Sequence, residues 1–421
     1  MTVGKQEVEF GWFIPTTGDG KYIGVEPERE STADYMIEVA QTAEKAGFTF
    51  ALIPTGGSCL DAWIVGSSIA VHTKKLKPLV ALRPGLIAPV LAARMAATLD
   101  VISGGRALIN VVTGGSPSDL QATGDPLALA HDERYGRTRE FLHIVKSIWT
   151  RSNDSGEKFL AGGGYHYGGD GKVNFKGRYY ELENGAGLPL PVQQPHPPLY
   201  FGGSSEAGKR TAVETSDVYL MWAEPLPWIE EQIQEVERIR SEVRAEKGTV
   251  RELRYGLRAQ IVVRPTEEEA WKEAWEIISK VEPDAVEWSS HRFKETDATN
   301  QQRQNQLREG SRDNGYLVGP NLWAGISILR GGGAMTFVGT PGQVADRLLE
   351  FVDIGISSFI LSGYPNLEEA QITGDLLLPV FKEKLAQRTN QTNQTNQTNY
   401  TNQTNQTNPT NPTNQEVTVE V

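Results

Sequence analysis

The sequence predicts an α/β protein built on eight parallel strands, and three observations support this fold class. Eight short apolar runs alternate with eight longer segments that carry helix signals, between residues 8 and 385. Several of these runs end in glycine, proline, serine or threonine, at the strand ends where α/β proteins build ligand sites. The chain of 421 residues can hold one barrel with insertions. The alternation favours a closed (β/α)8 barrel, and a doubly wound open sheet is the alternative.

The strands are assigned to short runs of apolar residues, because four to eight such residues bounded by turn signals are typical of a buried strand. We expect strands at 8–14, 49–54, 78–83, 108–112, 199–202, 218–222, 255–263 and 358–362.

The helices are assigned where a capping residue opens a longer segment and glycine closes it. Ser31 or Thr32 opens the first helix and Gly47 ends it, and Gly104 ends the third. We expect helices at 32–46, 61–71, 89–102, 132–149, 205–215, 228–246, 267–278 and 367–385.

Three segments interrupt this alternation. Residues 151–196 form a long connection rich in glycine and tyrosine, and residues 281–340 form another, rich in charge, glutamine and asparagine. A near-perfect TNQ repeat begins at Thr389. It buries too little apolar surface to offset chain entropy, so we expect disorder there. We therefore expect a barrel domain at 1–388 and a low-complexity, disordered tail at 389–421.

Composition excludes several classes of function. The formal net charge is −12, and no basic cluster occurs, which argues against binding to nucleic acid or to an anionic membrane. The single cysteine cannot form an intrachain disulfide and suits a reducing compartment. No apolar signal region and no membrane-spanning run are present. We expect a soluble, cytoplasmic protein.

The most informative stretch is RALINVVTGGSPSD, residues 106–119. Its apolar part is short enough to be a buried strand, and it breaks into small polar residues from Thr113 onward. Such an end presents backbone and hydroxyl groups to a ligand. The alternatives are a plain turn or an ATP-type phosphate loop, but no Gly-Lys-Ser/Thr follows for the latter.

A second candidate site follows the predicted strand at 199–202. Gly203, Ser204 and Ser205 stand directly before a predicted helix. Backbone N–H groups and hydroxyls at a helix N-terminus can bind an anion, and a cofactor phosphate is the natural one. A plain helix cap explains the same residues equally well.

Two further residues are candidates because of their place on strands. Arg258 lies inside a predicted strand, where an arginine is expected to be exposed, paired in a salt bridge or bound to an anion. Cys59 follows a strand end, either as a small buried apolar residue or as part of a site. No metal-binding spacing and no G-x-S-x-G hydrolase motif occurs, so we expect no metal.

Seven blocks in order resemble one family closely. The chain is similar from about residue 10 to 379 to the luciferase-like flavin-dependent monooxygenases, above all to the two-component alkanesulfonate monooxygenases. The blocks are FGWFIPTTGDGKYIG, ALIPTGGSCLDAW, ARMAATLDVISGGRALINVVTGG, HDERYGR, QPHPPLYFGGSS, RDNGYLVGPNLWAG and FILSGYPNLEEA.

The resemblance implies a fold and a reaction. The family folds as a (β/α)8 barrel with insertions, which decides between the two architectures. It uses reduced FMN (FMNH2) that a separate NAD(P)H-dependent FMN reductase supplies. With O2, it oxygenates a small organosulfur compound, and the expected reaction desulfonates an alkanesulfonate to an aldehyde and sulfite. We also expect a homo-oligomer, a dimer or a tetramer.

The resemblance also implies residue roles. The flavin and its phosphate are expected to contact Asn110, Thr113, Tyr135, Gly203, Ser204 and Ser205. The family's active-site positions are matched by Cys59, Trp222, Arg258, Arg312 and Tyr364, and Gln260 is a further expected active-site residue whose type differs from the family's. Arg258 and Arg312 are expected to hold a sulfonate, with Arg312 in a mobile lid.

The chain departs from the family at three pocket positions. Thr17, Gln260 and Asn366 stand where the family has histidine, so the pocket lacks groups that titrate near neutral pH. Two other functions therefore remain open. One is the same flavin chemistry on a sulfone or another small molecule, and the other is a flavin-binding relative without turnover.

Overall fold

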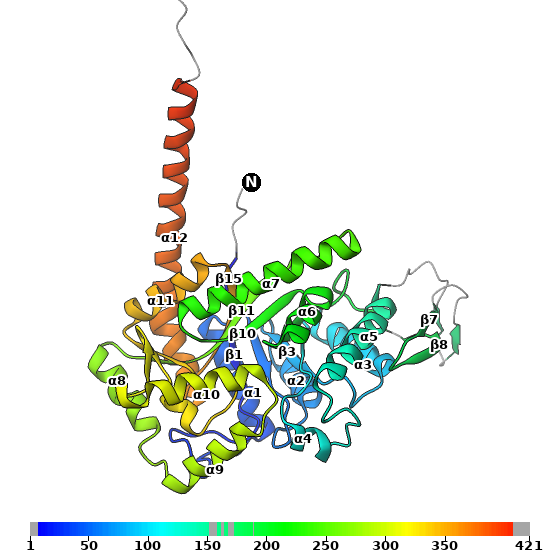
Figure 1. The fold of residues 1–421 in the computed structure, drawn as a ribbon, viewed down its shortest axis with the longest axis horizontal. Coiled ribbons are helices and arrows are strands. Elements are labelled where there is room, and N and C mark those ends of the chain that lie inside the picture. The colour runs from blue at the N-terminus through cyan, green and yellow to red at the C-terminus, as the bar shows by residue number, and fades with distance from the viewer. Residues whose placement is uncertain (1–6, 151–157, 161–163, 167–171, 188, 407–421) are drawn as a thin grey trace, which may run out of the picture.

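The computed structural model describes residues 7–150, 158–160, 164–166, 172–187 and 189–406. Its centre is a closed barrel of eight parallel strands (Figure 1). The strands are β1 (Glu9–Phe13), β2 (Phe50–Ile53), β3 (Lys77–Leu82), β4 (Leu108–Val111), β9 (Leu199–Gly202), β10 (Val218–Trp222), β11 (Arg254–Val263) and β15 (Ile356–Ser362). Each strand pairs with the next around the ring, and the pairing of β10 with β11 completes it. The predicted (β/α)8 barrel is confirmed.

Helices follow the strands and cover the outside of the barrel. They are α1 (Ala33–Ala46), α2 (Ala62–His72), α3 (Pro89–Ser103), α5 (His131–Trp149), α6 (Glu206–Thr215), α7 (Leu226–Lys247), α8 (Glu267–Ile277), α11 (Pro341–Asp353) and α12 (Asn366–Gln406). Local signals set their ends as expected. The hydroxyl of Thr32 accepts from Tyr35 N, and Gly47 ends α1 in the left-handed region.

The sequence analysis did not predict α11 (Pro341–Asp353) or β14 (Thr336–Gly339), nor the small elements in the connections described below. Helix α11 has Pro341 in its first turn and a capping box made by Thr340 and Gln343. The strand β14 (Thr336–Gly339) adds to β11 outside the ring. The apolar run of β14 is only four residues long, and it follows three glycines, so its strand signal is weak.

The two long connections carry small elements of their own. The first holds two antiparallel pairs, β5 (Lys158–Leu160) with β6 (Gly164–His166) and β7 (Val173–Lys176) with β8 (Glu181–Gly185). Much of its Gly/Tyr-rich part lies outside the described residues. The short helix α4 (Pro117–Ala122) follows β4.

The second connection is mostly helical. It contains α9 (Pro283–Lys294), α10 (Thr299–Ser311), the short 3-10 helices Arg312–Asn314 and Gly325–Ile328, and the strands β12 (Leu317–Gly319) and β13 (Leu322–Trp323). We call residues 283–311, which form α9 and α10, the insertion helices.

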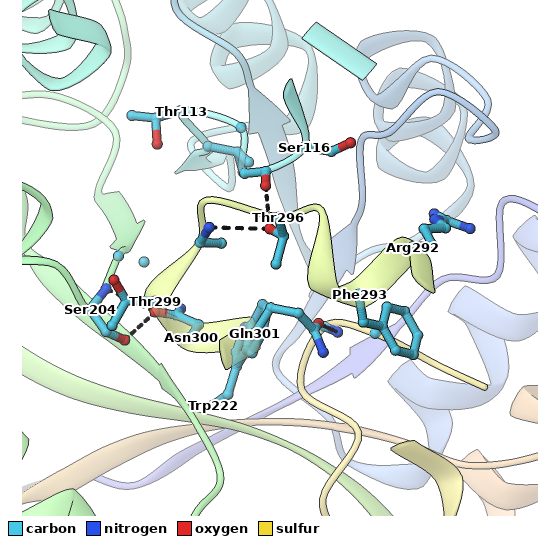
Figure 2. A pocket seen from close by; sticks show the side chains of 18 of the residues that line it. Thr113, Ser116, Ser204, Trp222, Arg292, Phe293, Thr296, Thr299, Asn300 and Gln301 are labelled. Carbon is cyan, nitrogen blue, oxygen red and sulfur yellow. Dashed lines mark hydrogen bonds between the residues drawn. The ribbon is translucent and has the colours of Figure 1, made fainter. Parts of the chain in front are cut away.

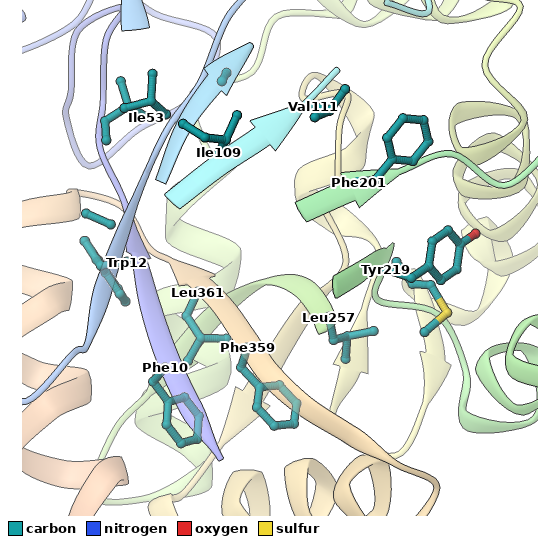
Figure 3. Packing of buried hydrophobic residues seen from close by; sticks show 14 of the residues in the cluster. Phe10, Trp12, Ile53, Ile109, Val111, Phe201, Tyr219, Leu257, Phe359 and Leu361 are labelled. Carbon is teal, nitrogen blue, oxygen red and sulfur yellow. The ribbon is translucent and has the colours of Figure 1, made fainter. Parts of the chain in front are cut away.

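Strand residues alternate between two apolar clusters. Phe50 and Leu52 belong to a cluster that contains strand residues alone, which is the barrel interior. Ala51 and Ile53 belong to a larger cluster that also contains helix residues. Figure 3 shows this outer layer, in which Phe10 stacks on Phe359 with ring centroids 5.3 Å apart. The period of two is that of a strand buried on both faces.

The barrel interior leaves no space for a side chain at Gly11. A Cβ atom there would lie 2.2 Å from the ring of Phe50, its partner in the β1–β2 register. Glycine at this position admits the large Phe50 ring into the interior. The apolar filling closes the barrel below its mouth, so a ligand has access only from the strand ends.

The C-terminal helix is longer than the sequence predicts. The composition of 389–421 predicts disorder, whereas α12 continues to Gln406. A helix that already exists can be extended without a new nucleation step, so residues of modest helix propensity can continue it. Residues 407–421 lie outside the described residues. Among the helices described, none is long and apolar enough to cross a membrane.

A chain truncated after Asn390 should retain the stability of the full chain. Among the described α12 side chains, buried core residues such as Leu377, Leu378 and Phe381 precede the cut. Figure 1 shows the rest of α12 projecting away from the barrel. We expect a change in unfolding free energy within ~0.5 kcal/mol by urea denaturation. The matched control Phe381→Ala should cost about 3–5 kcal/mol, and a comparable loss in the truncated chain would show that the tail packs.

Candidate functional site

Two adjoining cavities open where the carboxyl ends of the barrel strands meet. The larger cavity has a volume of about 1060 Å³, and the smaller cavity has a volume of about 300 Å³. Trp222, Arg292, Gly331 and Gly332 line both of them. A ligand in one cavity and a ligand in the other would therefore meet beside Trp222.

The smaller cavity gathers four of the residues predicted to contact the flavin. They are Thr113, Tyr135, Gly203 and Ser204, and they come from the ends of β4 and β9 and from α5. The hydroxyl of Tyr219 donates to the carbonyl of Gly203 at 2.9 Å and fixes the turn after β9. Residues 113–116 thus form a wall of this cavity.

The β9–α6 turn, residues 202–205, presents donors to the smaller cavity. Ser204 donates through its backbone N–H to Oδ1 of Asn300 at 2.8 Å, and its hydroxyl donates to the same oxygen (Figure 2). Ser205 is the N-cap of α6, and its hydroxyl accepts from Gly208 N. Ser205 therefore caps the helix, and Ser204 offers two donors to an oxygen at the helix N-terminus, where an anion is favoured.

The oxygen that receives these bonds belongs to the insertion helices. They are held to the barrel mouth at several points. The hydroxyl of Thr296 donates to the carbonyl of Gly115, and Arg303 pairs with the buried carboxylate of Glu224, with Nη2 and Oε2 2.7 Å apart. Arg134 of α5 pairs with Asp297. The segment around Asn300 thus covers the smaller cavity.

The larger cavity collects the predicted residues Cys59, Asn110 and Tyr364. It also contains Thr17 and Asn366, two of the positions where the family resemblance implies histidine. Among the described residues, no histidine lines either cavity.

Asn366 acts here in a hydrogen-bond network with a buried carboxylate. Its backbone N–H and its side-chain Nδ2 donate to Asp19, at 2.7 and 3.1 Å. The hydroxyl of Tyr35 donates to the same carboxylate at 2.6 Å. Burial raises the pKa of Asp19 above its ordinary value, although these hydrogen bonds lower it. Asn366 therefore donates to a buried carboxylate and cannot itself transfer a proton at neutral pH.

Arg258 and Gln260 lie behind the part of the larger cavity that Phe13 and Arg330 line, and we call this part the floor. Arg258 is 5% exposed, and its Nη2 donates to the hydroxyl of Ser362 at 2.6 Å. Its guanidinium carbon lies 5.1 Å from the ring centre of Phe13. Among the described residues, no carboxylate pairs with Arg258. Burial and the neighbouring charge of Arg330 lower the pKa of Arg258 to about 9, so it remains a cation at neutral pH.

The structure does not bring Arg312 to either cavity. Arg312 begins a 3-10 helix after α10 and is exposed. The arginines that line the larger cavity are instead Arg292 and Arg330, which the sequence analysis missed. Arg330 precedes three glycines, a weak sequence signal for a ligand loop.

A glycine behind Arg330 lets the chain pass close to the floor. Gly333 has φ of +69°, and a Cβ atom there would lie 2.7 Å from Cγ of Arg258 and 3.3 Å from the Trp222 ring. This close approach places the segment after Arg330 against the cavity floor. In the described part of the chain, no cluster of three or more histidine, cysteine or acidic side chains could hold a metal ion.

Solved structures similar to this chain share its fold over most of their length. A riboflavin lyase (RcaE), whose structure contains modified FMN and the substrate riboflavin, is 24% identical with a TM-score of 0.69, over 90% of this chain and 92% of that one. The EDTA monooxygenase (EmoA) from Chelativorans sp. BNC1 is 20% identical with a TM-score of 0.70, over 90% and 94%. A long-chain alkane monooxygenase (LadA) is 20% identical with a TM-score of 0.69, over 90% and 92%.

The sequence itself matches a family over most of the barrel. Residues 8–358 match the luciferase-like monooxygenases. The matched range includes β1 to β14, and therefore the ends of β4, β9 and β10 that line the two cavities. The chain belongs to the luciferase-like monooxygenase family.

Proposed function

We propose that this protein is the oxygenase of a two-component system that uses reduced FMN and O2 to oxygenate a small organosulfur compound. An alkanesulfonate, cleaved to an aldehyde and sulfite, is the proposed substrate. One observation carries the proposal: a cavity that ends at a helix N-terminus adjoins a larger cavity with a cationic floor.

The smaller cavity fits the phosphate end of FMN. The N-terminus of α6 and the two donors of Ser204 already hold an oxygen atom, Oδ1 of Asn300, and a phosphate oxygen could take the same donors. Tyr135 and Thr113 line the same cavity and would flank the cofactor chain. When bound, reduced FMN would supply the two electrons that the reaction requires.

The larger cavity fits an anionic substrate. Arg330 and Arg292 line it and Arg258 lies beneath it, and among the described residues none of the three pairs with a carboxylate. Cations left without a counter-ion favour an anion in the cavity. Trp222 stands where the two cavities meet, and Cys59 and Tyr364 line the larger one, where a substrate would be oriented. Asn110 also lines the larger cavity, so a flavin contact there requires the cofactor to reach into it.

The proposed reaction balances in atoms and charge. A sulfonate R–CH2–SO3⁻, O2 and FMNH2 give R–CHO, sulfite, water, FMN and one proton. The C–S bond breaks, and one oxygen atom enters the aldehyde while the other leaves as water. The insertion helices, which cover the smaller cavity, would keep bulk water from the reacting groups.

A second candidate substrate is a sulfone or another small neutral molecule. Thr17, Gln260 and Asn366, which stand where the resemblance implies histidine, support this candidate. Different polar groups in the pocket would suit a different substrate. A flavin-binding protein without turnover is the remaining alternative, and the same three replacements are its only support.

The proposal includes partners and a location. Reduced FMN would come from a separate NAD(P)H-dependent reductase. A homo-oligomer is proposed because Ile64 and Val71 of α2 and Leu91 and Ile102 of α3 are exposed apolar residues on neighbouring helices. The single cysteine, Cys59, supports a cytoplasmic location.

Sulfite release tests the proposed reaction. Wild-type protein with FMN, NADH, a flavin reductase and catalase should release sulfite from one or more members of a series from ethane- to decanesulfonate. Omitting FMN is the control. No sulfite at any chain length, together with oxidation of a dialkyl sulfone, would reject the sulfonate and support the second candidate.

Replacing Ser204 tests the cofactor assignment. Ser204→Ala should weaken reduced-FMN binding roughly tenfold, because the hydroxyl donates to an acceptor at the helix N-terminus, and bonds to charged groups are worth about 1.5–3 kcal/mol. Anaerobic fluorescence titration measures the affinity. Ser241→Ala on α7, whose hydroxyl bonds only to the helix backbone at Glu237, is the matched control. Equal affinity for Ser204→Ala and the control would refute the assignment.

The replaced histidines predict a weak pH dependence. Since no histidine among the described residues lines either cavity, single-turnover rates should vary less than about threefold between pH 6 and 8. Stopped-flow mixing of the enzyme–FMNH2 complex with substrate and O2 avoids the pH dependence of the reductase. A limb with a midpoint inside this range would contradict the prediction and indicate an essential group that titrates near neutrality.

A further inference from the structure

We propose that Arg330 binds the anionic group of the substrate and that Gln260 positions its guanidinium. The inference rests on the proposed function insofar as the substrate carries an anion. It assigns the contact to a residue outside the positions that the family resemblance carries over.

Arg330 lines the larger cavity, and contacts with Tyr364 and Phe13 fix the position of its guanidinium group. Its Nη1 donates to the hydroxyl of Tyr364 at 2.9 Å, and its guanidinium carbon lies 5.0 Å from the ring centre of Phe13. Both of these partners line the larger cavity as well. Among the described residues, no group accepts a hydrogen bond from Nη2 of Arg330. The planar guanidinium therefore retains donors for a ligand in the cavity.

Arg258 cannot make this contact in the same way. Its donors are directed into the protein, to the hydroxyl of Ser362 and to the carbonyls of Ala259 and Ile360. It does not line the larger cavity. Its guanidinium nevertheless lies over the same Phe13 ring as that of Arg330, at 5.1 and 5.0 Å. Arg258 thus adds a second positive charge behind the contact and strengthens the attraction for an anion at Arg330.

Gln260 links the two arginines. With its amide oriented to satisfy both ends, Oε1 accepts from Nε of Arg330 at 3.0 Å and Nε2 donates to the carbonyl of Ser362 at 3.0 Å. Ser362 in turn accepts from Arg258. Gln260 is 1% exposed and neutral, so it fixes the direction of Arg330 without adding or cancelling charge. A carboxylate here would still accept from Arg330, but it could not donate to the carbonyl of Ser362, and it would neutralise the floor.

This arrangement selects a chemical class of ligand. A guanidinium matches the spacing of two oxygens on a sulfonate, phosphonate or carboxylate. A neutral sulfone has two oxygens but no charge to balance the arginine pair. The structure therefore favours a small organic anion over a neutral isostere.

The test compares an anion with a neutral molecule of similar size. Dissociation constants for 1-butanesulfonate and for dipropyl sulfone are measured by anaerobic calorimetry with the enzyme saturated in reduced FMN. Arg330→Gln should weaken sulfonate binding on the order of 30-fold or more, the lower end of the cost of removing one partner from a buried charge pair. Sulfone binding should change less than about threefold.

Two variants at Gln260 separate charge from shape. Gln260→Glu keeps the acceptor for Arg330 and should weaken sulfonate binding by roughly tenfold or more, because it cancels the charge of the floor. Gln260→Leu loses the acceptor and should weaken sulfonate binding by about threefold to tenfold. Arg347→Gln, on the outer helix α11 in a pair with Glu350, is the charge control and should not change sulfonate binding.

Each outcome decides the inference. Selective loss of sulfonate binding in Arg330→Gln and Gln260→Glu, with reduced-FMN affinity and melting temperature retained, supports it. Wild-type binding in Arg330→Gln, or a selective loss in Arg312→Gln alone, overturns it, as does failure of the wild type to bind the sulfonate. If Arg330→Gln does not fold, Gln260→Glu decides by the same criterion. Sulfite release, scored separately, shows whether the desulfonation proposal fails while the anion contact stands.

Discussion

The pairing of β10 with β11 closes the sheet, and the whole site depends on this closure. Because the ring is parallel and closed, the carboxyl ends of all eight strands meet at one mouth. Residues as distant in sequence as Cys59, Ser204 and Tyr364 then line two cavities that share Trp222. Below the mouth, Phe50 and the other interior side chains fill the barrel, so that ligands are confined to the strand ends.

The second constraint is a buried charge without a counter-ion. Arg258 is held by a hydroxyl and two carbonyls, and Arg330 is its charged neighbour at the floor. Two cations that lie close together away from water destabilise the folded state, and their hydrogen bonds offset only part of this effect. An anionic ligand would remove the repulsion, so binding energy and fold stability are coupled at this site. The two arginines thus lower the stability of the folded protein at the place where the proposed chemistry needs a positive potential.

The sequence predicted much of the fold because strands and helices carry local signals. The eight strand runs and the caps at Thr32 and Gly47 required no tertiary information. For the same reason, the sequence located the site residues that have a local signal and missed those that tertiary contacts bring to the site. Ser204 follows a strand and precedes a helix, so its place is local, whereas the partner of its donors, Asn300, comes from a distant insertion without a motif. Arg312 matched a family block but lies outside the cavities, and Arg330 reaches the floor only through contacts with Tyr364 and Gln260. Such contacts depend on tertiary packing that no short sequence window contains.

A structure determined with FMN and 1-butanesulfonate bound tests the central claim most directly, since it locates both ligands at once. The account predicts the phosphate on the donors of Ser204, with Asn300 moved off them, and the sulfonate on Arg330 beside Tyr364. A phosphate bound elsewhere, or a sulfonate held by Arg312 with Arg330 uninvolved, would contradict it.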